Sequence, residues 1–442
     1  MNFYVRAIVS AALLGVLCSQ GSAIHAESVF ATTLPSGLRV IIRESHAINL
    51  AAVDIYVRAG SVNESAANSG VSHFVEHMIF KATERYGPGQ IDREIEGLGA
   101  ELNGGTSKDW VHFYTTVASE YLPAALDAVA DAIVNAQFRP EDIEKERQVI
   151  LDEIARAESN PSQRTFNLFS QAAFTVHPYR LPPMGARESI SGLTRNDLLA
   201  YYRQHYRPGN ACVVIVGDVV TSDALAVVQR AFKAFGAAQT SAQPGSPPAE
   251  PPLTSARVRR FRSLTDKAYV VLGYHAAPAL DLKEVCALDV ILALLGDTHR
   301  GRISAALNAN GTQFSTVTTD FVTQRHPTTF SVLVSVGPAD AENVVPVLLS
   351  EFHRLRVRAV PDNELDDAKR LVEGSDLFEQ ETFSGQARAL GLYESIASYD
   401  LALKYAPTVR SVSSADVMEV AKKYFTGGNC CVALVEPEPA QK

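Results

Sequence analysis

Hydrophobic and polar positions along the chain fall into two kinds of segment. Residues 51–59 alternate with a period of two, which predicts a β-strand, whereas residues 121–135 carry apolar side chains at helical spacing. Two hairpins are expected, at 30–44 around a Pro-Ser-Gly turn and at 100–117. Because hairpins are mixed with helices, the pattern predicts an α+β fold with helices packed on one face of a largely antiparallel sheet.

The second half of the chain repeats the first. Matching residues stand at a constant offset of 219 (416 − 197), and they are Asp197, Gly209, Asn210, Cys212 and Val213 against Asp416, Gly428, Asn429, Cys431 and Val432. The proline-rich residues 237–256 are typical of an exposed linker. We therefore expect two homologous domains, at 27–236 and 257–442.

Residues 69–80 predict a largely buried helix, with Asn68 or Ser69 as its N-cap. Three polar residues three or four positions apart share one face of this helix, and they are His73, Glu76 and His77. Burying two imidazoles and a carboxylate is costly without a partner. Histidines one turn apart match the tetrahedral geometry of zinc, although core histidines beside a chance glutamate would give the same spacing.

A catalytic zinc needs a third protein ligand and an open position for water. That ligand would be a carboxylate or an imidazole from another element, and Glu76 would stay free as a base. Zinc lowers the pKa of its water, so Glu76 could take the proton and return it to a departing amine. The corresponding helix of the second half, 282–295, has Asp289, Leu292 and Ala293 at these three positions, so metal chemistry is expected only in the first half.

The His-x-x-Glu-His pattern is the inverse of a common zinc-peptidase motif. Together with Glu-Arg-Gln-Val-Ile-Leu-Asp-Glu at 146–153, it resembles the M16 family of zinc peptidases, the inverzincins, which include pitrilysin, insulysin and the mitochondrial processing peptidase. The resemblance is to the short, two-domain branch. It implies two domains of the LuxS/MPP-like metallohydrolase fold and one Zn²⁺ per chain, bound by His73, His77 and Glu153. It also implies that Glu146 orients a ligand, whereas a solvated helix face is the alternative reading of Glu146.

Residues 102–106, Leu-Asn-Gly-Gly-Thr, resemble the edge strand on which this family binds the substrate backbone. The resemblance implies that Asn103, Gly104 and Thr106 contact substrate. The family usually has alanine after the asparagine, so Gly104 is a departure that a close backbone approach or a turn would explain.

Active members of the family carry an arginine and a tyrosine in the second half, where this chain has Asn308 and Phe314. The resemblance therefore implies a zinc-dependent endopeptidase acting on peptides or small unfolded proteins, completed by an M16-like subunit that supplies the Arg/Tyr pair. A homodimer is also possible. The alternatives are a non-catalytic scaffold or processing-complex subunit of the same fold, and a module in which zinc is structural.

Residues 1–26 combine Arg6 with a short apolar run and small residues, which is typical of a secretory signal peptide, so we expect a periplasmic protein. A formal charge of −9 without a basic run argues against a nucleic-acid partner, and no later segment predicts a membrane span. The spacing of Cys212, Cys286, Cys430 and Cys431 favours buried free thiols, although a disulfide is possible.

Overall fold

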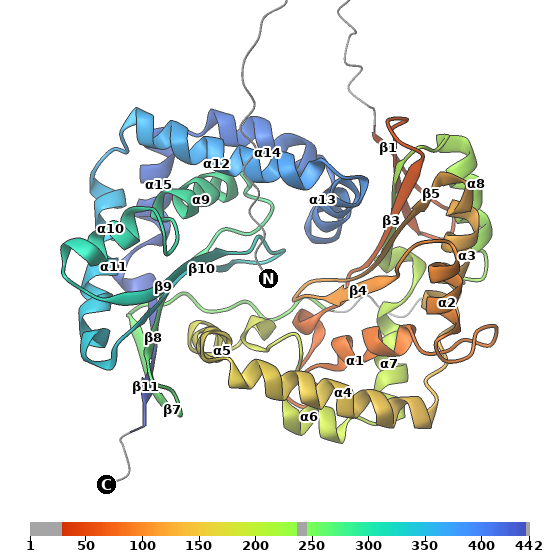
Figure 1. Cartoon of the computed structure of the whole chain (residues 1–442), viewed down its shortest axis with the longest axis horizontal. Helices are drawn as coiled ribbons and strands as arrows, with labels where there is room; N and C mark the ends of the chain where they lie inside the picture. Colours follow the sequence, from red (N-terminus) through yellow and green to blue (C-terminus); the bar gives the residue numbers. More distant parts are fainter. Residues whose placement is uncertain (1–28, 237–244, 439–442) are drawn as a thin grey trace, which may run out of the picture.

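The computed structural model describes residues 29–236 and 245–438, so the predicted signal peptide lies outside the described residues. The described chain forms two halves, each built on one twisted sheet (Figure 1). Among the described helices, none is long and apolar enough to cross a membrane.

The first sheet has six strands in the order β1-β2-β6-β3-β5-β4. They are β1 (Val29–Thr33), β2 (Arg39–Glu44), β3 (Leu50–Val57), β4 (Asn103–Thr106), β5 (Val111–Ala118) and β6 (Ala211–Gly217). Neighbours pair antiparallel except β2 with β6. The short strand β4 forms one edge, so its outer backbone groups are open to a further strand.

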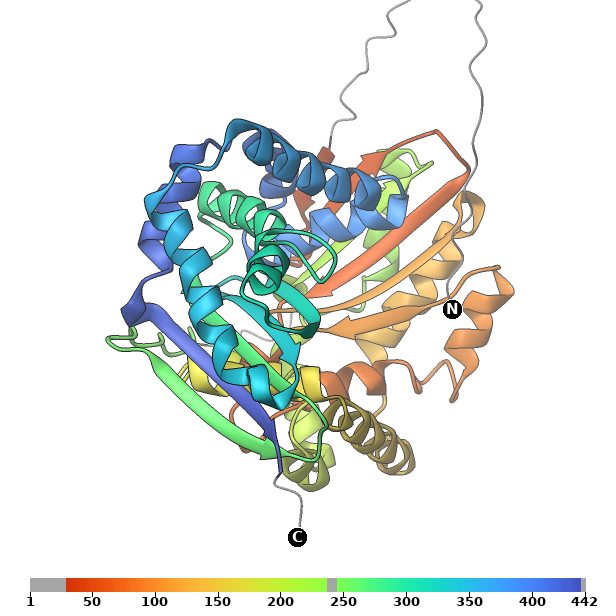
Figure 2. The same ribbon diagram turned by 60° about the vertical axis from the view of Figure 1, so that its left-hand side comes forward.

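The second sheet has five strands in the order β7-β11-β8-β10-β9. They are β7 (Arg257–Ser263), β8 (Ala268–Ala276), β9 (Phe314–Phe321), β10 (Thr328–Val336) and β11 (Cys430–Pro437). Its one parallel pair is β11 with β7. Strand β7 forms the edge of this sheet and lies on the outside of the molecule in Figure 2. The largely antiparallel sheets and both predicted hairpins are therefore confirmed.

Helices cover one face of each sheet and form its main core. In the first half they are α1 (Val71–Ile79), α2 (Gln90–Gly97), α3 (Leu122–Asn135), α4 (Pro140–Ser159), α5 (Pro161–Ala173), α6 (Arg187–Gly192), α7 (Arg195–His205) and α8 (Thr221–Ala231). In the second half they are α9 (Leu282–Leu295), α10 (Arg302–Ala309), α11 (Ala341–Val357), α12 (Asp362–Gln380), α13 (Phe383–Ile396), α14 (Asp400–Ser411) and α15 (Ser414–Tyr424). The predicted helix at 282–295 matches α9.

The opposite face of each sheet is covered by one helix of the other half. Helix α13 packs on β3 and β6 of the first sheet, and α5 packs on β8 and β11 of the second (Figure 1). Both helices occupy equivalent positions in the internal repeat, so the exchange is reciprocal. The sequence pattern predicted helices on one face only, and it gave no sign of this exchange. The division into domains at 236 and 257 remains a prediction, and the two sheets lie on either side of it.

The four cysteines in the described chain are buried and free, as expected: Cys212, Cys286, Cys430 and Cys431. Burial raises the pKa of each thiol, which keeps it protonated and unreactive near neutral pH.

Candidate metal centre

Helix α1 begins at Val71, two residues after the start of the predicted range 69–80. Its N-cap is Gly70, with φ of 90°, so the prediction of an Asn68 or Ser69 cap was wrong. Glu64 supplies the acceptor instead, taking hydrogen bonds from the backbone N–H of Gly70 at 2.7 Å and of Ser72 at 3.0 Å. The hydroxyl of Ser72 donates to the same carboxylate. A buried carboxylate six residues upstream thus fixes the start of the helix that carries the motif.

Glycine is required where α1 meets the loop at residues 181–186. A Cβ on Gly70 would come within 2.7 Å of the Gly185 Cα, and a Cβ on Gly185 within 2.6 Å of the Gly70 Cα. Both residues also have φ near 90°, which other residues rarely adopt. The loop therefore packs directly on the backbone that precedes His73.

The structure brings together the three predicted ligands. His73 Nε2 and His77 Nε2 are 3.2 Å apart, and each lies 3.7 Å from Glu153 Oε2. These three side chains are the one group of possible metal ligands found within the described residues. Helix α1 contributes both histidines and α4 contributes the glutamate.

This donor set fits a zinc ion. Two ligand atoms about 2.0–2.1 Å from a tetrahedral zinc lie roughly 3.4 Å apart, close to the three distances observed. Two imidazoles and one carboxylate are also the donor types of catalytic zinc sites, and they leave the fourth position open.

Glu146 contacts His77, one of the three clustered donors. Its Oε2 lies 3.0 Å from His77 Nδ1, and its Oε1 pairs with Lys81 Nζ at 2.8 Å. Burial raises the pKa of Glu146, but the hydrogen bonds from His77 and Lys81 outweigh it, so the net pKa is lowered and the group is a carboxylate. When His77 Nδ1–H donates to this carboxylate, Nε2 is left with its lone pair toward Glu153.

Glu76 lies beside the donor cluster but is not part of it. Its side chain is buried, and Thr106 Oγ1 donates to its Oε2 at 3.0 Å. Burial raises the pKa of Glu76, which makes it a better proton acceptor than an exposed carboxylate. Burial also lowers the pKa of His73 to about 3, with help from the charge of His77, so His73 stays neutral, as a metal ligand must.

The predicted substrate-binding residues lie on β4, next to Glu76. Asn103 is exposed at the edge of the sheet, whereas Thr106 contacts Glu76 directly. A Cβ on Gly104 would lie 2.8 Å from the ring of Phe80 and 3.0 Å from Glu76 Oε1. Gly104 therefore allows the edge strand to approach Glu76 closely, which gives the departure from alanine a physical reason.

A further histidine near the site was not singled out from the sequence. His112 on β5 is buried, and its Nδ1 lies 3.0 Å from Asp54 Oδ1 on β3. Burial has the largest effect on the pKa of Glu76 and raises it, whereas the charge of His112 is one of the smaller effects that lower it. The signal available in the sequence was Asp54 itself, a carboxylate inside the apolar run 51–57.

The second half holds no equivalent cluster among its described residues. Asp289 accepts a hydrogen bond from the Tyr405 hydroxyl at 2.7 Å, and Leu292 and Ala293 are apolar. Asn308 lies on α10, and Phe314 begins β9. The predicted loss of the metal ligands in this half is consistent with these positions.

A cavity of about 960 Å³ adjoins the donor cluster. Glu153 lies in its wall, together with the end of α4, one side of α5 and the loop at residues 181–186. Apolar side chains line part of it, including Ile154, Leu168 and Met184. The site therefore has open space next to Glu153, one of its three donors.

Comparisons with known proteins relate this chain to a family of zinc peptidases. Residues 39–187 match the family described as insulinase (peptidase family M16), and residues 192–372 match the peptidase M16 inactive domain. The chain is 27% identical over 398 residues to an uncharacterized zinc protease of Streptomyces coelicolor, covering 88% of this chain and 86% of that protein. It is 26% identical to a probable mitochondrial-processing peptidase subunit beta of Arabidopsis thaliana, covering 96% and 81%.

A solved structure of a protease from Helicobacter pylori superposes with a TM-score of 0.87 over 93% of this chain and 100% of that one. At 23% identity this likeness establishes the shared fold. The two family matches together span most of the described residues, and the inverted zinc motif lies inside the first. The chain therefore belongs to peptidase family M16.

Proposed function

We propose that this chain is a zinc-dependent endopeptidase that hydrolyses peptides or small unfolded proteins. The observation that carries the proposal is the spare carboxylate of Glu76, buried beside three donors that already suffice for a catalytic zinc site. A structural zinc site uses four protein ligands and has no need of a base. A non-catalytic scaffold would have no reason to retain five costly polar groups here: His73, Glu76, His77, Glu146 and Glu153.

Zinc bound by His73, His77 and Glu153 would supply a Lewis acid that lowers the pKa of water and polarises the scissile carbonyl. Glu76 takes the proton from the attacking water and delivers it to the departing amine nitrogen. Thr106 holds Glu76 through its Oε2, so the other oxygen is the one available for proton transfer. Glu146 keeps His77 in the correct tautomer.

An extended substrate would add to the free edge of β4, with its backbone along Asn103 and Gly104. This places a peptide bond next to Glu76, because Gly104 approaches that carboxylate so closely. The cavity beside Glu153 would receive a substrate side chain.

The decisive experiment compares Glu76→Gln with the unchanged protein. We expect Glu76→Gln to retain about one zinc per chain by elemental analysis but to lose roughly 10²–10⁴-fold in cleavage of a quenched fluorescent peptide. Glu153→Gln should lose the zinc itself. The matched control is Glu141→Gln, an exposed residue of the same helix α4, which should change neither. Unchanged cleavage in Glu76→Gln would refute catalysis by this site and favour the scaffold alternative.

We also propose that a second M16-like subunit carrying the Arg/Tyr pair completes the site, since Asn308 and Phe314 provide neither a cation nor a phenol. A relative of this chain is described as a subunit of the mitochondrial processing peptidase. Mixing the zinc-loaded chain with such a subunit should increase kcat/KM and yield a heterodimer by light scattering. Equal cleavage with and without the partner would rule this out. Export to the periplasm through residues 1–26 stays a proposal, which N-terminal sequencing of the mature protein tests.

A further inference from the structure

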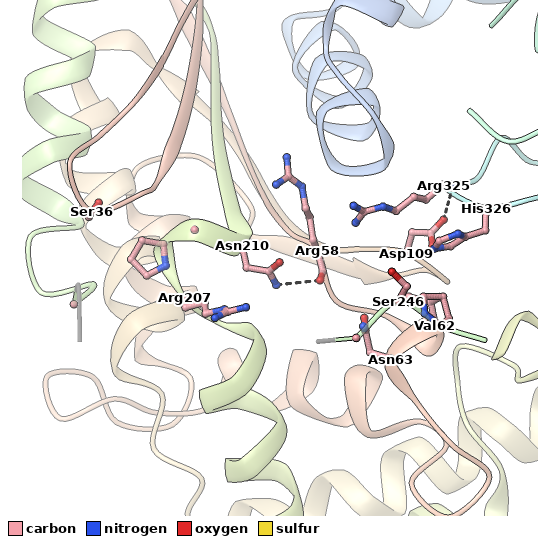
Figure 3. A pocket seen from close by; sticks show the side chains of 15 residues that line it. Ser36, Arg58, Val62, Asn63, Asp109, Arg207, Asn210, Ser246, Arg325 and His326 are labelled. Atoms are coloured by element: carbon pink, nitrogen blue, oxygen red, sulfur yellow. Dashed lines mark hydrogen bonds between the residues drawn. The ribbon is translucent and has the colours of Figure 1, made fainter. Parts of the chain in front are cut away.

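The cavity of about 960 Å³ beside the donor cluster is larger than one substrate side chain requires, because sites of about 300–1,000 Å³ enclose a whole drug-sized ligand. It lies between helix α5 and the loop at residues 181–186, and Glu153 lies in its wall. A cavity of about 410 Å³ at the junction of the halves, shown in Figure 3, has none of the three donors in its described lining. Of the two, the larger cavity therefore continues from the candidate metal centre.

Helix α5 supplies this cavity with side-chain amides at helical spacing. Four amide residues line it, three or four positions apart, and they are Asn160, Gln163, Asn167 and Gln171. This spacing puts them on one face of the helix. Gln163 Nε2 donates to Asn167 Oδ1 at 3.2 Å, so these two amides are aligned along the helix. With a rise of about 1.5 Å per residue, the row is roughly 16 Å long, which is the length of about five extended residues.

The rest of the lining shows little preference for one kind of side chain. The loop at residues 181–186 supplies an apolar part of it. Met184 in this loop is 36% exposed, and its unbranched thioether adapts to groups of different shape. Formal charges in the lining are equal in number, with Arg156 and Arg164 against Glu153 and Glu158. The lining side chains by themselves therefore select neither a cation nor an anion.

We propose that this cavity binds the main chain of an extended substrate segment next to the scissile bond, with little selection among its side chains. A carboxamide has an acceptor oxygen and two N–H donors, so it can pair with either group of a peptide unit. Such main-chain hydrogen bonds give affinity whatever the sequence, while the apolar loop contacts the side chains. The inference rests on the proposed endopeptidase function and defines its substrates as unfolded segments with about five residues on one side of the cut.

The first test measures binding of fluorescein-labelled peptides to the Glu76→Gln chain by fluorescence anisotropy, which requires no cleavage. Asn167→Leu combined with Gln171→Met should raise Kd about tenfold for two unstructured peptides of unrelated sequence, because two hydrogen bonds are lost. The control is Gln229→Met, at an exposed position of α8 outside the cavity, which should leave Kd unchanged. If the double variant does not fold, Gln171→Met alone, at an exposed position, should raise Kd about threefold.

The second test measures cleavage by the unchanged chain of peptides lengthened residue by residue on each side of the mapped cut. On one side KM should fall over about five residues and then level off, with kcat unchanged, as expected for uniform binding. The double variant should raise KM for the longer peptides only. Unchanged Kd in the double variant, equal weakening by Gln229→Met, or weakening for one of the two sequences alone would overturn the proposal. Amide-dependent binding without any cleavage by the unchanged chain would instead refute the endopeptidase and leave the peptide site.

Discussion

At the scale of single residues, the candidate metal centre depends on Glu64, a carboxylate outside the donor cluster. Glu64 is 6% exposed and accepts from two backbone N–H groups and one hydroxyl at the start of α1. These are helix N-terminal donors that would otherwise be buried without partners. Glu64 thus fixes the position of the first turn of α1, which carries His73, and His77 follows one turn later.

We predict that Glu64→Ala lowers the free energy of unfolding by about 2–3 kcal/mol, because it leaves the N–H groups of Gly70 and Ser72 buried and unpaired. The same change should weaken zinc binding, since the first turn of α1 loses its anchor. Urea denaturation and competition with a zinc chelator measure the two effects.

Glu64→Gln keeps an acceptor oxygen and should recover most of both properties. Glu101→Gln, at an exposed position, is the control. Zinc affinity and stability that are unchanged in Glu64→Ala would show that the helix start does not depend on this residue.

Sequence reasoning found the groups that lie close together in the chain. His73, Glu76 and His77 share one helix face, so their spacing alone predicts their proximity. Glu153 lies on another helix and was indicated only by the family resemblance. Glu64 and the His112–Asp54 pair were missed because their partners are set by tertiary packing, for which no periodicity in the sequence exists.

At the scale of elements, α5 and α13 each pack closely on the sheet of the other half because a glycine faces an aromatic ring at the contact. On the second sheet, a Cβ on Gly273 of β8 would lie 2.5 Å from the Phe169 ring of α5. On the first sheet, a Cβ on Gly391 of α13 would lie 2.3 Å from the Tyr56 ring of β3. The glycine is on the strand in one case and on the helix in the other, so both helices sit close to their sheets.

We predict that Gly391→Ala destabilises the protein by about 1–3 kcal/mol, because the new methyl group pushes α13 away from Tyr56. Gly374→Ala is the matched control, since Gly374 lies inside α12 and its added Cβ would meet no atom within 4 Å beyond its chain neighbours and the backbone of its own helix. There alanine should be neutral or stabilise by up to about 1 kcal/mol through helix propensity. Urea denaturation of both variants checks the contrast, and equal effects would argue against tight seating of α13.

Element positions were largely predictable, because hairpins and amphipathic helices have local signatures. The packing of α5 and α13 on the sheet of the other half was not predictable. The apolar positions of each helix show that one of its faces is buried, but not which sheet buries it. Their burial requires only an apolar partner surface, and both halves provide one.

At the scale of the whole molecule, a group of imidazoles lies where the two halves meet. His177 is buried, with its ring centroid 5.2 Å from that of His326 and 4.2 Å from that of Tyr179. Burial lowers the pKa of His177 to about 4, and the charges of His326, Lys108 and His275 act in the same direction, opposed by Glu250. Burial also lowers the pKa values of His275 and His326.

A histidine whose pKa is lower in the folded protein binds its proton first in the unfolded chain, so acid favours unfolding. The contribution of His177 is complete above its unfolded pKa of about 6.5 and is lost as the pH falls toward 4. The free energy of unfolding should fall between pH 7 and pH 5 in the unchanged protein. We predict that this fall is smaller by about 1–2 kcal/mol in His177→Asn.

The backbone N–H of Tyr179 donates a hydrogen bond to His177 Nδ1 at 3.2 Å. Asparagine at position 177 retains a side-chain acceptor for this bond. His353→Asn, at an exposed position of α11, should leave the pH dependence unchanged. Urea denaturation at several pH values measures it, and an identical slope in His177→Asn would contradict the assignment.

The reciprocal exchange of α5 and α13 has a consequence for how the chain is made and inherited. A ribosome completes the first sheet long before α13, so an emerging chain carries an uncovered apolar face that includes Tyr56, Cys212 and Val214. A gene cut at the linker would yield two products with such faces rather than two independent proteins. The arrangement is that of a domain-swapped dimer joined into one polypeptide. In such an arrangement neither repeat can be removed without exposing an apolar face of the other, even though the predicted metal ligands all lie in the first.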